Sequence, residues 1–227
     1  MTQAVPGTRI GILGGTLDPI HVGHVETALA AKRALDLVSV IVMPARVPPH
    51  RHNGPSASTF HRFAMAALAV NGLPGLCVSD EELSADGPSY TALTLERLAR
   101  RGIDRSQIFF ITGADAFAEI ETWHRYPEVL DLANFVVISR PGLTAGAMTE
   151  RLPGLRSRFH LAGTSVPLPE EPAVFLVDAV TPNVSSTDIR RRLREGTPVT
   201  GLVPPPVEDH IVRHRLYMEP STADHLR

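Results

Sequence analysis

Two histidines near the N-terminus have the residue type and spacing to contact phosphate. His21 and His24 lie three positions apart at the start of a predicted helix over Val22 to Asp36, so their rings can share one face. Imidazoles can donate hydrogen bonds to phosphate oxygens, and a helix N-terminus attracts anions. The pair therefore indicates an anion site, although two histidines after a turn can also be plain surface residues.

The residues before this pair suit a close approach to a nucleotide. Arg9 to Leu13 is short and mostly apolar, as a buried strand would be. Gly14 and Gly15 follow; glycine can adopt a positive φ and places no side chain between backbone and ligand. With Thr16 next in the chain, we expect a turn at the glycines.

A second candidate anion site lies more than 150 residues later. Ser185 and Ser186 stand directly before a predicted helix, where they can act as N-caps, and Thr187 falls in its first turn. Arg190 lies one turn on and can face back across the helix start. Hydroxyls, free N–H groups and a guanidinium bind anions well. Taken alone, the pattern also fits an ordinary capped helix with a basic face.

Strands and helices are predicted to alternate along the chain. The predicted strands cover 9–13, 38–43, 76–79, 108–112, 135–139 and 174–177, and the predicted helices cover 22–36, 60–70, 89–101, 116–121, 127–132, 187–195 and 207–214. Alternation of this kind predicts an α/β fold with an open, doubly wound parallel sheet, in one Rossmann-like domain over residues 1–218. Residues 141–172 are predicted to be an irregular excursion with at most one short helix, and 219–227 a frayed tail.

Ligands of such sheets bind beyond the carboxyl ends of the strands. The segments that follow the predicted strands carry the polar residues: 14–24, 45–51, 113–115, 139–142 and 184–190. We expect these five segments to converge on one crevice.

Composition excludes several classes of protein. A net charge of −2 over 227 residues argues against a broad nucleic-acid surface. Lys32 is the only lysine and lies within a predicted helix, so there is no P-loop. Cys77 is the only cysteine, which leaves no internal disulfide and no Cys-x-x-Cys metal site. Without a membrane-spanning run or a leader pattern, a cytoplasmic protein is expected, and a homo-oligomer is compatible with the sequence.

The two anion motifs together resemble the nucleotidyltransferase superfamily that carries a His-x-Gly-His signature. Residues 14–19 followed by 21–24 match the first signature, with Leu17 where the family usually has Phe. Residues 184–190 match the second signature, Ile-Ser-Ser-Thr-x-x-Arg, with Val184 in place of Ile. Class I aminoacyl-tRNA synthetases share the first signature, but their second signature depends on lysines that this chain lacks.

Further segments resemble the bacterial nicotinate-nucleotide adenylyltransferases over nearly the whole chain. They are Pro-Pro-His-Arg at 48–51, Pro-Ser-Tyr-Thr at 88–91, Gly-Ala-Asp at 113–115, Thr-Trp at 122–123 and Arg-Pro-Gly at 140–142. The resemblance implies NAD biosynthesis: the phosphate of nicotinate mononucleotide attacks the α-phosphorus of ATP, giving nicotinate adenine dinucleotide and pyrophosphate. No protein nucleophile is needed, so catalysis consists of positioning and charge stabilisation.

The resemblance also implies roles for individual residues. The catalytic residues are expected to be His24, His21 and Arg190. ATP and its phosphates are expected to contact Gly14, Gly15, Thr16, His50, Arg51, Gly113, Asp115, Ser185, Ser186 and Thr187. Tyr90, Thr91 and Trp123 are expected to bind the nicotinate end, with Trp123 stacking on the pyridinium ring. A core tryptophan beside a capped helix is the plainer alternative for that segment.

Magnesium is the expected cofactor because it neutralises the triphosphate of ATP. No carboxylate cage is evident, so phosphates and water are expected to hold the ion. Asp18 equally suits capping of the turn before Pro19, and no protein ligand to the metal is predicted. His210, His214 and His225 lack acidic or cysteine partners at ligand spacing, which argues against a metal site near the C-terminus.

Three other functions remain as alternatives. A phosphopantetheine adenylyltransferase would share both signatures but would not need the segments at 88–91 and 122–123. A nucleotide sensor without catalysis is expected to have lost His24 or Arg190, and both are present. A Rossmann oxidoreductase is disfavoured, because residues 11–15 do not give Gly-x-Gly-x-x-Gly and no acidic residue follows the second predicted strand.

Overall fold

A parallel β-sheet forms the centre of the molecule in the computed structural model, which describes residues 8–49, 54–139, 145–162 and 170–218. Within those residues the sheet has seven strands in the order β3-β2-β1-β4-β5-β7-β6. The strands are β1 (Ile10–Gly15), β2 (Ser39–Pro44), β3 (Leu76–Val78), β4 (Ile108–Gly113), β5 (Asn134–Ile138), β6 (Phe159–Leu161) and β7 (Val174–Val177). β1 lies between β2 and β4, and both pairings are parallel.

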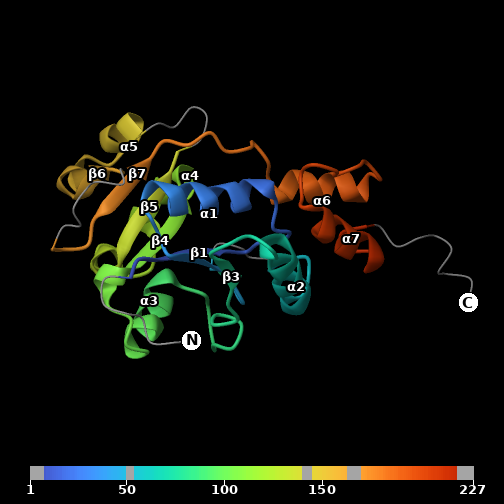
Figure 1. Ribbon diagram of the computed structural model, residues 1–227, viewed down its shortest axis with the longest axis horizontal. Helices are drawn as coiled ribbons and strands as arrows, with labels where there is room; N and C mark the ends of the chain where they lie inside the picture. The colour runs from blue at the N-terminus through green and yellow to red at the C-terminus, as the bar shows by residue number, and fades with distance from the viewer. Residues whose placement is uncertain (1–7, 50–53, 140–144, 163–169, 219–227) are drawn as a thin grey trace, which may run out of the picture.

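Helices cover both faces of this sheet (Figure 1). The α-helices are α1 (Val22–Ala34), α2 (Thr59–Val70), α3 (Thr91–Arg100), α4 (Ala114–Phe117), α5 (Ala145–Arg151), α6 (Ser186–Arg194) and α7 (Pro205–Arg213). Short 3₁₀ helices are η1 (Arg105–Gln107), η2 (Ile120–Thr122), η3 (Glu128–Asp131) and η4 (Pro153–Arg158). Every helix among the described residues is too short or too polar to span a lipid bilayer.

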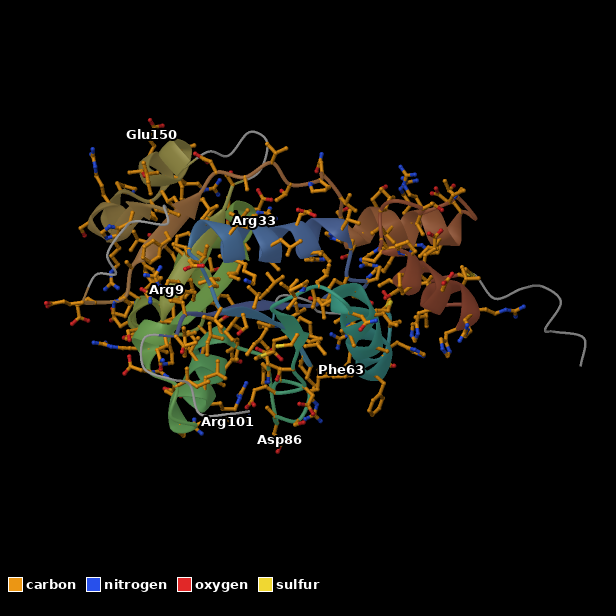
Figure 2. All side chains as sticks on the ribbon, in the orientation of Figure 1. Arg9, Arg33, Phe63, Asp86, Arg101 and Glu150 are labelled. Atoms are coloured by element: carbon orange, nitrogen blue, oxygen red, sulfur yellow. The ribbon has the colours of Figure 1, made fainter. Side chains whose placement is uncertain are left out.

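Two apolar cores result from the alternation of side chains along each strand. In β4, Phe109 and Ile111 face one core, which also includes residues of α1, α2, α6 and α7. Ile108 and Phe110 face the other core, with residues of α3, α4 and α5. Side chains crowd both faces of the sheet in Figure 2, whereas Asp86, Arg101 and Glu150 lie at the periphery. The predicted doubly wound sheet is therefore confirmed.

The prediction of an irregular excursion over 141–172 was wrong for its central part. This segment contains α5, η4 and an additional edge strand, β6, which pairs with β7 from Phe159↔Val174 to Leu161↔Leu176. A strand of three residues is too short to show a period of two, and three nearby arginines obscure it further. Residues 140–144, 163–169 and the predicted tail, 219–227, lie outside the described residues.

Candidate active site

The turn after β1 falls two residues later than predicted. Gly14 and Gly15 stay in the strand, paired with Met43 and Pro44, and neither has a positive φ. Leu17 instead takes the left-handed conformation, with φ at 50°. A Cβ on Gly14 would lie 3.3 Å from the Phe110 ring, so glycine serves close packing at this position.

His21 and His24 form a stacked pair at the N-terminus of α1, as their spacing predicted. The ring centroids lie 3.7 Å apart with an interplanar angle of 27°, and the His21 N–H donates to Nδ1 of His24 at 3.2 Å. His21 is 3% exposed, whereas His24 is half-buried. A Cβ on Gly23 would lie 3.1 Å from the His21 ring and 3.3 Å from the Pro182 carbonyl oxygen. Glycine between the two histidines therefore makes room for the stack.

The N–H groups at the start of α1 are not all available to a ligand. The Val22 N–H donates to the Leu202 carbonyl at 3.1 Å, and the His24 N–H donates to the His21 carbonyl at 3.0 Å. Two N–H groups at this helix start are therefore already occupied by protein carbonyls. The His24 side chain is therefore the main candidate donor to an anion here.

Asp18 joins the two predicted anion motifs. Its carboxylate is completely buried and accepts hydrogen bonds from the N–H groups of Ser56 (2.7 Å) and Ala57 (3.1 Å). The Arg190 guanidinium donates to the Asp18 backbone carbonyl at 2.6 Å, and the Ser186 hydroxyl donates to the Pro19 carbonyl at 2.9 Å. The start of α6 is thereby fixed against the turn that follows β1.

The cap of α6 agrees with the prediction in part. Ser185 is the N-cap, and its hydroxyl accepts from the Asp188 N–H at 3.1 Å, while Ser186 is already helical. Arg190 faces back as expected and donates to the Thr187 hydroxyl at 3.3 Å. The next arginine, Arg191, forms an ion pair with Asp188 on the surface of α6.

A cavity of about 440 Å³ opens beside the glycines of β1. The end of β1 and the segment after β2 form one part of its lining. Aromatic and polar side chains from β4, from the start of α3 and from the segment after η2 form most of the rest. The lining residues are Gly14, Gly15, Thr16, Ala45, Pro48, Pro49, Glu82, Ser89, Tyr90, Thr91, Phe110, Thr112, Ala116, Trp123 and His124. The predicted turn and the predicted nicotinate residues therefore share one cavity.

Aromatic rings form one wall of this cavity. Tyr90 stacks on His124 with centroids 4.2 Å apart. Trp123 is half-buried and meets Phe110 edge-on at 6.0 Å and Phe135 at 6.3 Å. Trp123 therefore packs on the core and also lines the cavity, while its stacking on a pyridinium ring stays a prediction.

Two buried charged residues in this region were not predicted. Arg62 on α2 is completely buried and donates to the carbonyls of Thr16 (2.8 Å) and Ala45 (2.6 Å). Glu82 lines the cavity, is 5% exposed and accepts from the Thr94 hydroxyl at 2.6 Å. Burial raises the pKa of the Glu82 carboxyl above its ordinary value. A charged residue inside an apolar helix was the only sequence signal for Arg62.

Some predicted site residues lie apart from this cavity. Gly113 is the N-cap of α4, next to the cavity-lining Thr112. Asp115 is exposed in the first turn of α4 and is not among the lining residues. His50 and Arg51 lie outside the described residues, as does the segment 140–142.

The described side chains do not form a dedicated metal site. Among the described residues, no three His, Cys, Asp or Glu side chains are arranged to hold an ion. Asp18 is an unsuitable ligand because it is fully buried and its oxygens accept the hydrogen bonds given above. No catalytic step is therefore assigned to a protein-bound metal.

Comparisons with known proteins bear on this site. A profile of the Cytidylyltransferase-like family matches residues 12–192. A Desulfatibacillum aliphaticivorans protein named "Probable nicotinate-nucleotide adenylyltransferase" is 39% identical over 218 residues, covering 92% of this chain and 100% of the relative. A protein of the same name from Pectobacterium atrosepticum is 40% identical over 207 residues, covering 90% and 96%.

Solved structures support the fold. The Plasmodium falciparum nicotinic acid mononucleotide adenylyltransferase complexed with APC superposes with a TM-score of 0.70 at 17% identity, over 92% of this chain and 97% of that one. The same enzyme complexed with NaAD gives a TM-score of 0.69 at 17% identity and the same coverage. Together with the sequence relatives, these findings show that the chain belongs to the Cytidylyltransferase-like family and, within it, to the bacterial nicotinate-nucleotide adenylyltransferases.

Proposed function

We propose that this protein transfers the adenylyl group of ATP to nicotinate mononucleotide, releasing pyrophosphate and forming nicotinate adenine dinucleotide. One observation carries the proposal: a single cavity joins the backbone of Gly14 to Thr16 with Tyr90, Thr91 and Trp123. The first group suits a nucleotide phosphate, and the second suits a flat ring with a carboxylate. The names of the sequence relatives support the same reaction.

Direct displacement suits the residues at the start of α1 and α6. The mononucleotide phosphate attacks the α-phosphorus of ATP while the bond to the β-phosphate oxygen breaks, and no protein nucleophile takes part. We assign His24 to donate to the reacting phosphate, and the 3.7 Å stack with the His21 ring supports this assignment because it fixes the orientation of the imidazole. Arg190 and the Thr187 hydroxyl are assigned to the departing pyrophosphate. Catalysis then depends on placement and on donors that face the developing charge.

The nicotinate end is assigned to the start of α3 and the aromatic wall. Thr91 is the first residue of α3, so its N–H and hydroxyl can hold a carboxylate at a helix N-terminus. Trp123 offers a ring to the pyridinium of the substrate. We assign Asp115 to a ribose hydroxyl, which requires the substrate to extend beyond the cavity toward α4.

Magnesium enters this proposal as part of the substrate MgATP. The described residues provide no carboxylate cage, so the phosphates and water carry the ion. ATP and mononucleotides are metabolites of the cytoplasm, and we place the reaction there.

The direct test is pyrophosphate release from MgATP with nicotinate mononucleotide or nicotinamide mononucleotide as acceptor. Release with the nicotinate form, and much less with the amide form, is expected. Equal rates with both acceptors would keep the reaction but contradict the carboxylate role of Thr91. A lack of release with either acceptor would overturn the proposed function, and 4′-phosphopantetheine would then be the next acceptor to test.

A further inference from the structure

We propose that His61 on α2 and His210 on α7 bind a divalent ion of an imidazole-binding metal such as zinc, which joins the two helices. The exposed imidazole of His214 supplies a third ligand, and water completes the coordination. This site is separate from the cavity described above, and the inference does not depend on adenylyl transfer.

The three histidines come from two distant segments of the chain. The sequence alone argued against a metal site near the C-terminus, because His210 and His214 have no acidic or cysteine partner at ligand spacing. The helices α2 and α7 lie side by side (Figure 1), and α2 contributes a further imidazole, that of His61. This arrangement is fixed by an apolar core that includes Met65 of α2 and Ile211 of α7.

Two imidazole nitrogens have the separation that two ligands of one ion require. Nδ1 of His61 lies 3.1 Å from Nε2 of His210. Zinc–nitrogen bonds are about 2.0 to 2.1 Å long, so two bound nitrogens lie about 2.9 to 3.4 Å apart for bond angles of about 90° to 109°. Without an ion, one of the two nitrogens carries a proton and donates it to the other. An ion can replace this hydrogen bond through rotation of the rings, with no movement of the helices.

The third imidazole lies next to this pair. The ring centroid of His214 is 4.4 Å from that of His210 and 4.9 Å from that of His61. Among the described residues, no three side chains of the ligand types already form a metal site, so His214 must rotate to join the pair. Its side chain is exposed at the C-cap of α7, which leaves room for that rotation. Three imidazoles and one water then give a tetrahedral zinc site.

The chemistry of the cluster favours zinc, copper or nickel over magnesium. These metals bind imidazole, whereas magnesium prefers oxygen ligands. A metal ligand must be a neutral imidazole, and burial, followed by neighbouring positive charges, lowers the pKa of His210 below its ordinary value. Arg213 is one of these charges, and it also repels a cation. We therefore expect moderate rather than tight binding.

The two helices that the ion joins also support the turn after β1. Arg62, the neighbour of His61, donates to the Thr16 carbonyl at 2.8 Å. The chain beyond α7 carries Tyr217, whose hydroxyl donates to Oδ1 of the buried Asp18 at 2.8 Å. An ion between α2 and α7 therefore stabilises both elements that hold this turn.

Calorimetric titration of the metal-free full chain with ZnCl₂ tests the site directly. We expect one zinc ion to bind per chain, and MgCl₂ should not compete with it. In His61→Gln and in His210→Gln, the Kd for zinc should rise more than about tenfold. The matched control is His160→Gln, which removes a histidine from the edge strand β6 and should leave the Kd unchanged.

Thermal unfolding provides a second readout. Zinc at about ten times its Kd should raise the Tm of the wild type by about 3 to 6 °C, because the ion binds the folded state. At the same zinc concentration the rise should be absent in His61→Gln and His210→Gln, and smaller in His214→Gln than in the wild type. Each variant is compared with and without zinc, which separates metal binding from the effect of the substitution on stability.

Two results would overturn the proposal: no zinc binding to the wild type, or equal zinc affinity in the wild type and in both glutamine variants. Loss of binding in His160→Gln with retention in the other variants would place the ion elsewhere and overturn it as well. If His61→Gln does not fold, His210→Gln carries the same test, because it removes the other ligand. Turnover is not measured in these experiments, so their outcome is independent of the proposed function.

Discussion

The Arg62 guanidinium donates a hydrogen bond of 2.8 Å to the Thr16 carbonyl, and a second bond of 2.6 Å joins it to the Ala45 carbonyl. A helix residue thereby fixes the segments that follow β1 and β2, two neighbouring walls of the cavity. Substitution Arg62→Met fills similar space but leaves these buried carbonyls without their donor. We expect unfolding free energy to fall by about 3 kcal/mol in urea denaturation.

The matched control for Arg62→Met is Arg33→Met on α1. Arg33 is 67% exposed and only 3.9 Å from Glu26, so its loss should change stability by less than about 0.5 kcal/mol. Equal effects of the two substitutions would show that the buried hydrogen bonds of Arg62 contribute little.

Gly23→Ala should reduce catalysis although alanine favours helices. The new Cβ would lie 3.1 Å from the His21 ring and 3.3 Å from the Pro182 carbonyl, so the histidine stack must shift. We expect kcat to fall about tenfold, in line with the sensitivity of catalysis to small misplacements. Gly154→Ala in η4 meets nothing within 4 Å and should leave kcat unchanged. A Gly23→Ala enzyme with wild-type kcat would contradict the fit described for the pair.

His24→Ala should lower turnover far more than substrate binding. Removal of one donor to the developing charge typically lowers kcat by about 100-fold or more. The KM for nicotinate mononucleotide should change little, because His24 is not among the cavity-lining residues. Steady-state kinetics with both substrates checks this expectation, and an equal loss in kcat and in mononucleotide binding would reject the role assigned to His24.

Glu82→Gln should strengthen the preference for the nicotinate acceptor. Because its pKa is raised, the buried carboxyl gains charge only at higher pH, and that charge then opposes the carboxylate of the substrate. At pH 8.5 we expect the ratio of kcat/KM for nicotinate over nicotinamide mononucleotide to rise about tenfold. Glutamine can still accept from the Thr94 hydroxyl.

The control for Glu82→Gln is its neighbour. Glu81 is similarly buried, at 6% exposed, but pairs with Arg97 and Arg101 and does not line the cavity. Glu81→Gln should leave the acceptor ratio unchanged. A rise in the ratio with both variants would assign the effect to overall charge rather than to the position of Glu82.

Stability should fall on acidification because of histidines packed between α2 and α7. Nδ1 of His61 lies 3.1 Å from Nε2 of His210, and the His210 and His214 rings are 4.4 Å apart. Burial, followed by the charges of His214, His61 and Arg213, lowers the pKa of His210 below 6.5. The folded protein therefore favours the neutral ring of His210, and this preference stabilises the fold in full above pH 6.5. The stabilisation is lost as the pH falls through the pKa that His210 has in the folded state.

Thermal melts between pH 7.5 and 5.5 test this expectation. The drop in Tm over that range should be smaller in His210→Gln than in the wild type, whereas His160→Gln, on β6, should retain the full drop. An identical pH dependence in His210→Gln would exclude the cluster as its source.

Local patterns were sufficient to predict most of the fold. The strong apolar runs became β1, β2, β4, β5 and β7, because buried parallel strands have a clear sequence signal. The spacing of His21 and His24 also predicted that they can share one face of the helix start, and their rings do lie together. β6 was missed because three residues at a sheet edge carry too little periodicity.

Contacts between distant residues could not be predicted in this way. The pairing of Arg62 with two carbonyls, and of His61 with His210, depends on how α2 packs in three dimensions. The turn lies at Leu17 rather than at the glycines, and Gly14 packs against Phe110, almost 100 residues later. Tertiary packing decided each of these, and no local propensity encodes it.

The hydrogen bond between Asp18 and Tyr217 spans 199 positions of the chain. At synthesis rates of about 5 to 20 residues per second, roughly 10 to 40 s separate the two residues on the ribosome. During that interval the aspartate lacks its tyrosine partner, so the hydrogen-bond set around the turn after β1 is completed only once residue 217 has been made. The Asp18–Tyr217 contact therefore forms late in synthesis, and nascent chains that stall before α7 is complete should lack it.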